Sequence, residues 1–387
     1  MNINTTDIQQ IDLLKGFAII SVILGHIVSY QVITNSKIGS VIVNQGVDLL
    51  KNSNQNIDVS EILSLKAIPT FFTHWITFSS LTTQQVVPIF IIILSFNLSL
   101  SFQRKDYSGL QEMFSRFELK KRFRRYFIPY FSIFLMSLII GLVFLLITNQ
   151  NILTINFRLF LGYLPIDGPG NYFIPLIIQM VVFFPVLYVF YKYNRYLCLI
   201  AGFVLAFFCE IINHFGTNAT WYSDCLVRFL PLIILGIWIS DLYLKSQLKN
   251  KYFILFGIIS GIYLIIISQF EMGVICGIHF IPYTADQNLF ACGWPSLILI
   301  LGLLWLPKMK NFLTKSIAAL GKSSYHIYLV QIVYFGIFSG FSIKYHTPID
   351  LFSPNNVLNI VIPLSIIIVF GYIFYFLDQH NFFMRNE

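Results

Sequence analysis

Long apolar runs separated by short polar segments make up most of the 387-residue chain. Each run is close to the roughly 20 residues that a helix needs to cross a bilayer. Helices satisfy their own backbone hydrogen bonds, which lipid cannot do for them. The pattern therefore predicts an all-α integral membrane protein with about ten transmembrane helices, at residues 12–33, 85–102, 126–148, 172–191, 196–214, 226–244, 252–270, 289–306, 323–341 and 356–378.

Composition supports this class, because 57% of the residues are hydrophobic and only 11% are charged. Soluble domains carry about twice that proportion of charged residues, roughly 25%. We find no internal repeat of the kind seen in transporters and no low-complexity linker. We therefore expect residues 1–387 to form a single integral membrane domain.

The distribution of lysine and arginine predicts the orientation. With a cytoplasmic N-terminus, the cytoplasmic side carries eighteen of these residues and the opposite side five, namely Lys37, Lys51, Lys66, Arg158 and Lys344. Positive charge concentrates in cytoplasmic loops, so we expect both termini in the cytoplasm of a multi-pass plasma-membrane protein. Topology and the anionic lipid of the bilayer then explain the net charge of +8, and we expect no nucleic-acid partner.

The first apolar run carries three ionisable residues, Asp12, Lys15 and His26. At about 100° per residue they fall within roughly 60° of one another, and Lys15 and His26 lie roughly 16 Å apart along the axis. Ionisable groups inside a membrane span are costly, so the first interpretation is functional. The alternatives are that Asp12 and Lys15 reach the interface, and that His26 is a packing residue.

A basic stretch, ELKKRFRRYFIPYF, ends the cytoplasmic loop at residues 103–125 and leads into the third predicted helix. Arginine and lysine clustered at a membrane surface suit phosphate groups, through charge and through bidentate hydrogen bonds. The alternative is that these charges only orient the helix. On the outer side, Tyr172 opens the fourth helix at the level where aromatic residues gather at the interface.

Ionisable residues also flank the short outer turn between the fifth and sixth helices. Glu210 ends one helix and Arg228 begins the next, so their depths match and each is the obvious partner of the other. Trp221 lies in the turn between them. These residues form either a structural ion pair or the wall of an outward-facing polar site.

Several of these stretches together resemble the membrane-bound acyltransferase 3 family. Asp12, Lys15 and His26 resemble its opening motif, and KKRFRRYFIPYF its basic approach to the third span, with Arg122 and Arg125 at the matching places. Further similar stretches are VVPIFIIILSFNLS, GNYFIPLIIQMVVFFPVL, RFLPLIILGIWIS and LGKSSYHIYLVQ. The chain departs from the family pattern at four positions: Lys15 stands for arginine, Tyr172 for tryptophan, Phe96 for glycine and Gln331 for histidine.

The resemblance implies transfer of an acyl group from acyl-CoA to a sugar hydroxyl of a cell-envelope or exported glycan. Acetyl-CoA would be the donor substrate, with no metal and no permanently bound cofactor. His26 would be catalytic, either as general base or through an acyl-histidine, with Asp12 orienting Lys15. Lys15, Arg122 and Arg125 would bind the donor, and the acceptor would lie near Tyr172, Glu210, Trp221 and Arg228.

Two other functions remain open at this stage. One is a transporter or flippase for a lipid-linked or small sugar, in which Lys15, Glu210 and Arg228 line a path without covalent chemistry. The other is a sensor or scaffold that keeps the fold without the reaction. Protein-dependent release of CoA separates acyl transfer from both.

Overall fold

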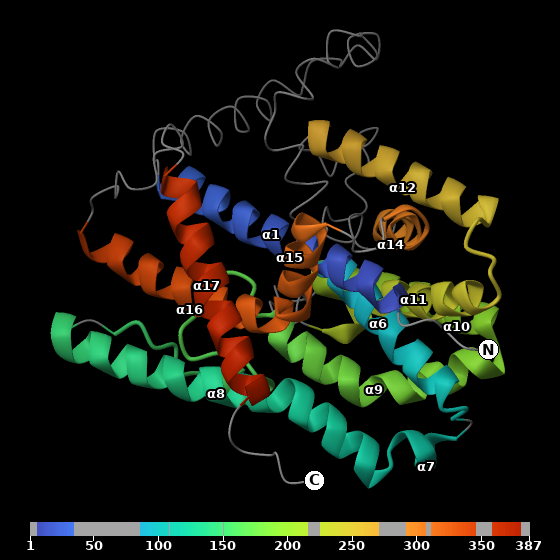
Figure 1. The fold of residues 1–387 in the computed structure, drawn as a ribbon, viewed down its shortest axis with the longest axis horizontal. Coiled ribbons are helices and arrows are strands. Elements are labelled where there is room, and N and C mark those ends of the chain that lie inside the picture. Colours follow the sequence, from blue (N-terminus) through green and yellow to red (C-terminus); the bar gives the residue numbers. More distant parts are fainter. Residues whose placement is uncertain are drawn as a thin grey trace, which may run out of the picture.

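The computed structural model describes residues 6–34, 86–107, 109–149, 151–215, 225–270, 292–306, 311–345 and 358–380. Within these ranges the chain is helical apart from turns, loops and one isolated bridge between Leu153 and Ile166 (Figure 1). The all-α prediction is therefore confirmed for the described residues.

A helix lies in each of the ten ranges predicted from hydropathy. They are α1 (Thr6–Thr34), α6 (Val86–Arg104), α8 (Arg116–Thr148), α9 (Phe173–Tyr193), α10 (Arg195–Phe215), α11 (Leu230–Leu244), α12 (Lys251–Phe270), α14 (Gly293–Trp305), α16 (Ser324–Tyr345) and α17 (Leu358–His380). The boundary prediction was wrong at α8, which begins at Arg116 instead of residue 126. Hydropathy misses residues 116–125, nearly three turns of helix, because Lys, Arg and Glu are strong helix formers despite their charge.

Six of the described helices contain a segment long and apolar enough to cross a membrane: Gln9–Ile27, Val86–Arg104, Arg124–Thr148, Phe173–Tyr193, Leu226–Leu244 and Ile360–His380. In α10, α12, α14 and α16 the apolar stretch within the described residues is shorter. The number of ten crossings, the cytoplasmic termini and the single domain stay predictions.

The outer helices expose apolar side chains over much of their length. On α8, Leu135 is 59% exposed, Ile139 62% and Leu146 83%, and α17 exposes Phe370 and Phe376 in the same way. Contiguous apolar surface of this extent is unfavourable in water and matches contact with lipid tails. The chain is a membrane protein.

Helix α1 runs through the centre of the molecule, where it contacts α6, α14, α15 (Phe312–Lys322), α16 and α17 (Figure 1). Helix α15 crosses it at two glycines. A Cβ on Gly16 would overlap the Ile317 carbonyl, and one on Gly321 would overlap the Asp12 carbonyl. This close approach covers the end of α1 that carries Asp12 and Lys15, an arrangement that the sequence does not predict.

The loop between α8 and α9 folds back onto α16. It contains the 3₁₀ turn η1 (Phe157–Leu161), and Ile166 within it is fully buried. The Asn171 side chain closes the loop by accepting from the Leu164 amide at 2.9 Å and donating to the Leu164 carbonyl at 3.2 Å. The loop therefore brings Gly170 against α16.

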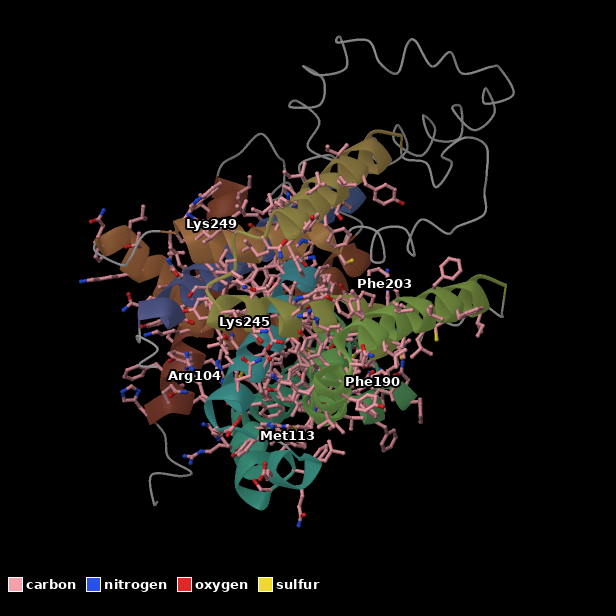
Figure 2. The ribbon with its side chains drawn as sticks, turned by 90° about the vertical axis from the view of Figure 1, so that its right-hand side faces the viewer. Arg104, Met113, Phe190, Phe203, Lys245 and Lys249 are labelled. Atoms are coloured by element: carbon pink, nitrogen blue, oxygen red, sulfur yellow. The ribbon has the colours of Figure 1, made fainter. Side chains whose placement is uncertain are left out.

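Basic side chains at the ends of several helices lie toward the same edge of the molecule. Arg104 ends α6, while Lys245 follows α11 and Lys249 precedes α12. Figure 2 shows these three residues on one side of the view, and Phe203 of α10 on the other.

Candidate active site

A cavity of about 1020 Å³ lies between α1, α6, α8, α16 and α17. This is at the upper end of the size range of small-molecule pockets. Two carboxylates line it, Asp12 and Asp378, against eight lysine and arginine side chains: Lys15, Arg104, Lys105, Lys121, Arg122, Arg124, Arg125 and Lys322. The excess of positive charge makes the cavity suitable for a polyanionic ligand.

Asp12 and Lys15 form an ion pair on the wall of this cavity, with 3.4 Å between Oδ1 and Nζ. Their side chains are only 7% and 17% exposed. Arg125 lines the same cavity as Lys15. Both residues of the pair therefore face a buried, charged cavity, which explains their place in a membrane helix better than contact with the membrane interface does.

The two predicted donor-binding arginines differ in their surroundings. Arg122 is buried, and its guanidinium lies 4.6 Å from the centroid of the Phe102 ring. Arg125 is exposed at the cavity, 5.6 Å from the Tyr126 ring centroid. Stacking on an aromatic face holds a guanidinium in a fixed plane. The structure thus brings Lys15, Arg122 and Arg125 together as the sequence predicts.

His26 lies next to the inner end of the cavity. Tyr328 and Phe173 line that end, and their rings are 5.1 Å apart. The Tyr328 hydroxyl donates to the Gly170 carbonyl at 2.7 Å. A Cβ added to Gly170 would lie 3.7 Å from His26 Nε2, so Tyr328 and His26 both lie next to this glycine. Phe335 packs on the imidazole edge to face, at 6.0 Å between centroids.

The predicted acceptor residues are only partly described. Tyr172 is the N-cap residue of α9 and lies two residues after Gly170, whose carbonyl accepts from the Tyr328 hydroxyl. Arg228 lies in the 3₁₀ turn η3 (Leu226–Phe229), partly buried against the Phe229 ring. The Glu210 side chain and all of Trp221 lie outside the described residues. The pairing of Glu210 with Arg228 therefore stays a prediction.

Sequence reasoning did not select His326 or Asp378, which are paired at 2.9 Å on the cavity wall. It also missed Tyr328 and Gly170 beside His26. The polarity of LGKSSYHIYLVQ is a signal for His326 and Tyr328, but no periodicity indicates a partner 52 residues away. Among the described residues, no three His, Cys, Asp or Glu side chains are grouped so that they could hold a metal ion.

Comparison with known proteins gives a family assignment. No curated protein and no solved structure matches the chain at a significant level. A family model described as an acyltransferase domain, Acyl_transf_3, matches residues 8–376. The match includes His26 and all of the cavity lining except Leu377, Asp378 and Gln379. The chain therefore belongs to the acyltransferase 3 family and is a membrane acyltransferase.

Proposed function

We propose that this protein transfers an acetyl group from cytoplasmic acetyl-CoA to a hydroxyl of a cell-envelope or exported sugar, and that it acts in the plasma membrane. The observation that carries the proposal is the cation-lined cavity whose inner end lies beside His26. A donor with phosphates at one end and a reactive thioester at the other matches a site whose cationic part is separated from a partly buried histidine by apolar walls.

The part of the cavity that is lined by lysine and arginine would bind the phosphates of CoA. Arg122 is held against Phe102, and Lys15 is held by Asp12, so both cations are oriented before a ligand arrives. Such preorganisation reduces the entropy lost on binding. Charge-assisted hydrogen bonds from these groups and from Arg125 to phosphate oxygens are about twice as strong as neutral ones.

The inner part of the cavity would hold the pantetheine arm. Its walls there are apolar and aromatic: Phe90, Ile93, Leu94, Phe173, Ile177 and Tyr328. Lys15 and His26 lie on the same helix roughly 16 Å apart along its axis. An extended arm that starts at the phosphate site would therefore carry the thioester toward His26.

In the proposed reaction, neutral His26 takes the proton of the acceptor hydroxyl as its oxygen attacks the thioester carbonyl carbon. The tetrahedral intermediate then collapses, the carbon–sulfur bond breaks, and the proton passes from His26 to the CoA sulfur. General-base assistance of this type contributes roughly 10² to 10⁴ in rate. Direct attack by the imidazole, through an acyl-histidine, uses the same residue and gives the same products.

The acceptor would approach from the side of Tyr172 and Arg228. Tyr172 lies two residues after Gly170, which contacts Tyr328 and lies beside His26, so a sugar bound there would be close to His26. Glu210 and Trp221 complete the proposed acceptor site on sequence grounds. The family match favours acyl transfer over a transporter or flippase, and supplies no support for the latter.

The test uses membranes that contain the wild type or His26→Ala, radiolabelled acetyl-CoA and a crude envelope glycan. We expect label in the glycan and protein-dependent CoA release with the wild type only, and equal amounts of inserted protein for both. Transfer by His26→Ala at the wild-type rate would contradict the mechanism. Absence of CoA release from the wild type with acetyl-CoA and with longer acyl donors would contradict the proposed activity.

A further inference from the structure

Gln331 carries an unusual buried amide. The residue is 0% exposed, and neither Nε2 nor Oε1 has a hydrogen-bond partner in the described part of the chain. Buried polar groups in native proteins nearly always have a partner, because leaving one unsatisfied costs the desolvation of that group. An apolar residue of the same size would be more favourable for folding alone. The amide therefore requires a reason other than packing.

The position of Gln331 on α16 supplies that reason. It lies three residues after Tyr328 and four before Phe335, and these three positions fall within about 60° around the helix. Tyr328 donates to Gly170 beside His26 Nε2, and the Phe335 ring packs on the His26 imidazole. Gln331 therefore lies between two residues that both adjoin His26, on the same face of α16.

The segment of α1 that carries His26 is apolar. On α1, Ile19, Ile23 and Ile27 are fully buried around the His26 segment, and Phe335 is 1% exposed. In such an environment a hydrogen bond to a developing charge is stronger than in water. A fixed donor aimed at an oxyanion in a site that excludes water is among the largest contributions to catalysis of acyl transfer.

We propose that Gln331 is a catalytic residue whose Nε2–H donates to the carbonyl oxygen of the acyl group during transfer. This inference rests on the proposed function. As the acceptor oxygen bonds to the carbonyl carbon and its proton passes to His26, the carbonyl oxygen becomes an oxyanion and accepts from Gln331. When the carbon–sulfur bond breaks, the carbonyl reforms and the proton on His26 moves to the departing sulfur.

The test compares Gln331→Met with the wild type and with Leu329→Met. Methionine keeps the volume of glutamine and removes its donor. Leu329 is also fully buried on α16, but points away from the Gln331 face, so it is a matched control. Purified proteins in lipid nanodiscs are compared for thermal transition, kcat and the KM for acetyl-CoA. Gln331→His, which returns an N–H donor, is the rescue variant.

We expect Gln331→Met to keep or raise the transition temperature, keep KM within about twofold, and lose roughly 10²-fold in kcat, as for removal of one oxyanion donor. The kcat of Gln331→His should be at least tenfold higher than that of Gln331→Met, and the kcat of Leu329→Met should match that of the wild type. Wild-type kcat in Gln331→Met, or a lower transition temperature that accounts for the loss, would overturn the assignment. An inactive wild type would instead refute the proposed function.

Discussion

Replacing Gly170 with alanine tests the contact that joins the cavity to His26. Gly170 has φ of +88°, a conformation that costs an L-residue about 1–2 kcal/mol. The new Cβ would also overlap the Tyr328 hydroxyl, which now donates to the Gly170 carbonyl at 2.7 Å. Displacing that hydroxyl leaves a buried polar group unsatisfied, at about 1–3 kcal/mol.

The expected loss of stability follows from these contributions. Their sum is about 2–5 kcal/mol, and alanine returns about 0.4–1 kcal/mol by reducing the entropy of the unfolded chain. The net loss is then about 1–4 kcal/mol, or a fall of about 2–8 °C in transition temperature at about 2 °C per kcal/mol. Transfer activity should fall about 10²-fold, because a shift of about 1 Å beside the catalytic group has that effect.

Thermal unfolding in nanodiscs and a transfer assay measure both effects. Gly109→Ala is the control, because Gly109 has φ of −120° and open space at its Cβ position. A double-mutant cycle with Tyr328→Phe isolates the clash, and we expect a coupling energy of at least about 1 kcal/mol. Additive effects in that cycle, or a Gly170→Ala protein as stable as Gly109→Ala, would refute the reasoning.

Three further predictions concern the cavity and its walls. Arg125→Gln should raise the KM for acetyl-CoA about ten- to hundredfold. It should leave the KM for acetyl-pantetheine unchanged, because this truncated donor lacks the nucleotide phosphates. Equal changes in KM for both donors would show that Arg125 does not bind those phosphates. His326→Phe should lower the unfolding free energy by about 1–3 kcal/mol, since Asp378 loses its 2.9 Å partner, and unchanged thermal unfolding would show that the pair is not stabilising. Gly321→Leu should separate α15 from α1 and lower the transition temperature, whereas Gly109→Leu should not, as differential scanning fluorimetry can show.

Periodicity within one segment predicted much of the fold and part of the site. Asp12 and Lys15 share a face of α1, and in the structure they form an ion pair on one cavity wall. The basic run before Pro129 predicts a phosphate site, and Arg122 and Arg125 lie in the same cavity. These features are local, because spacing along a helix fixes which side chains share a face.

Contacts between distant segments escape such reasoning. The pairing of His326 with Asp378, the crossing of α15 over α1 at Gly321, and the return of Gly170 to α16 all depend on tertiary packing. A glycine at a helix crossing and a glycine in a turn look alike in a sequence. Gln331 shows the same limit, since its significance lies in buried amide atoms that only the structure reveals.

The stoichiometry of acetyl transfer tests the central claim most directly. Purified protein in nanodiscs is given acetyl-CoA labelled in the acetyl group and an envelope glycan, and released CoA and glycan-bound label are counted together. The account predicts one acetyl group transferred per CoA released by the wild type, with both rates lower by roughly 10²-fold or more in His26→Ala. Glycan labelling that is unchanged in His26→Ala, or glycan transported without CoA release, would contradict it.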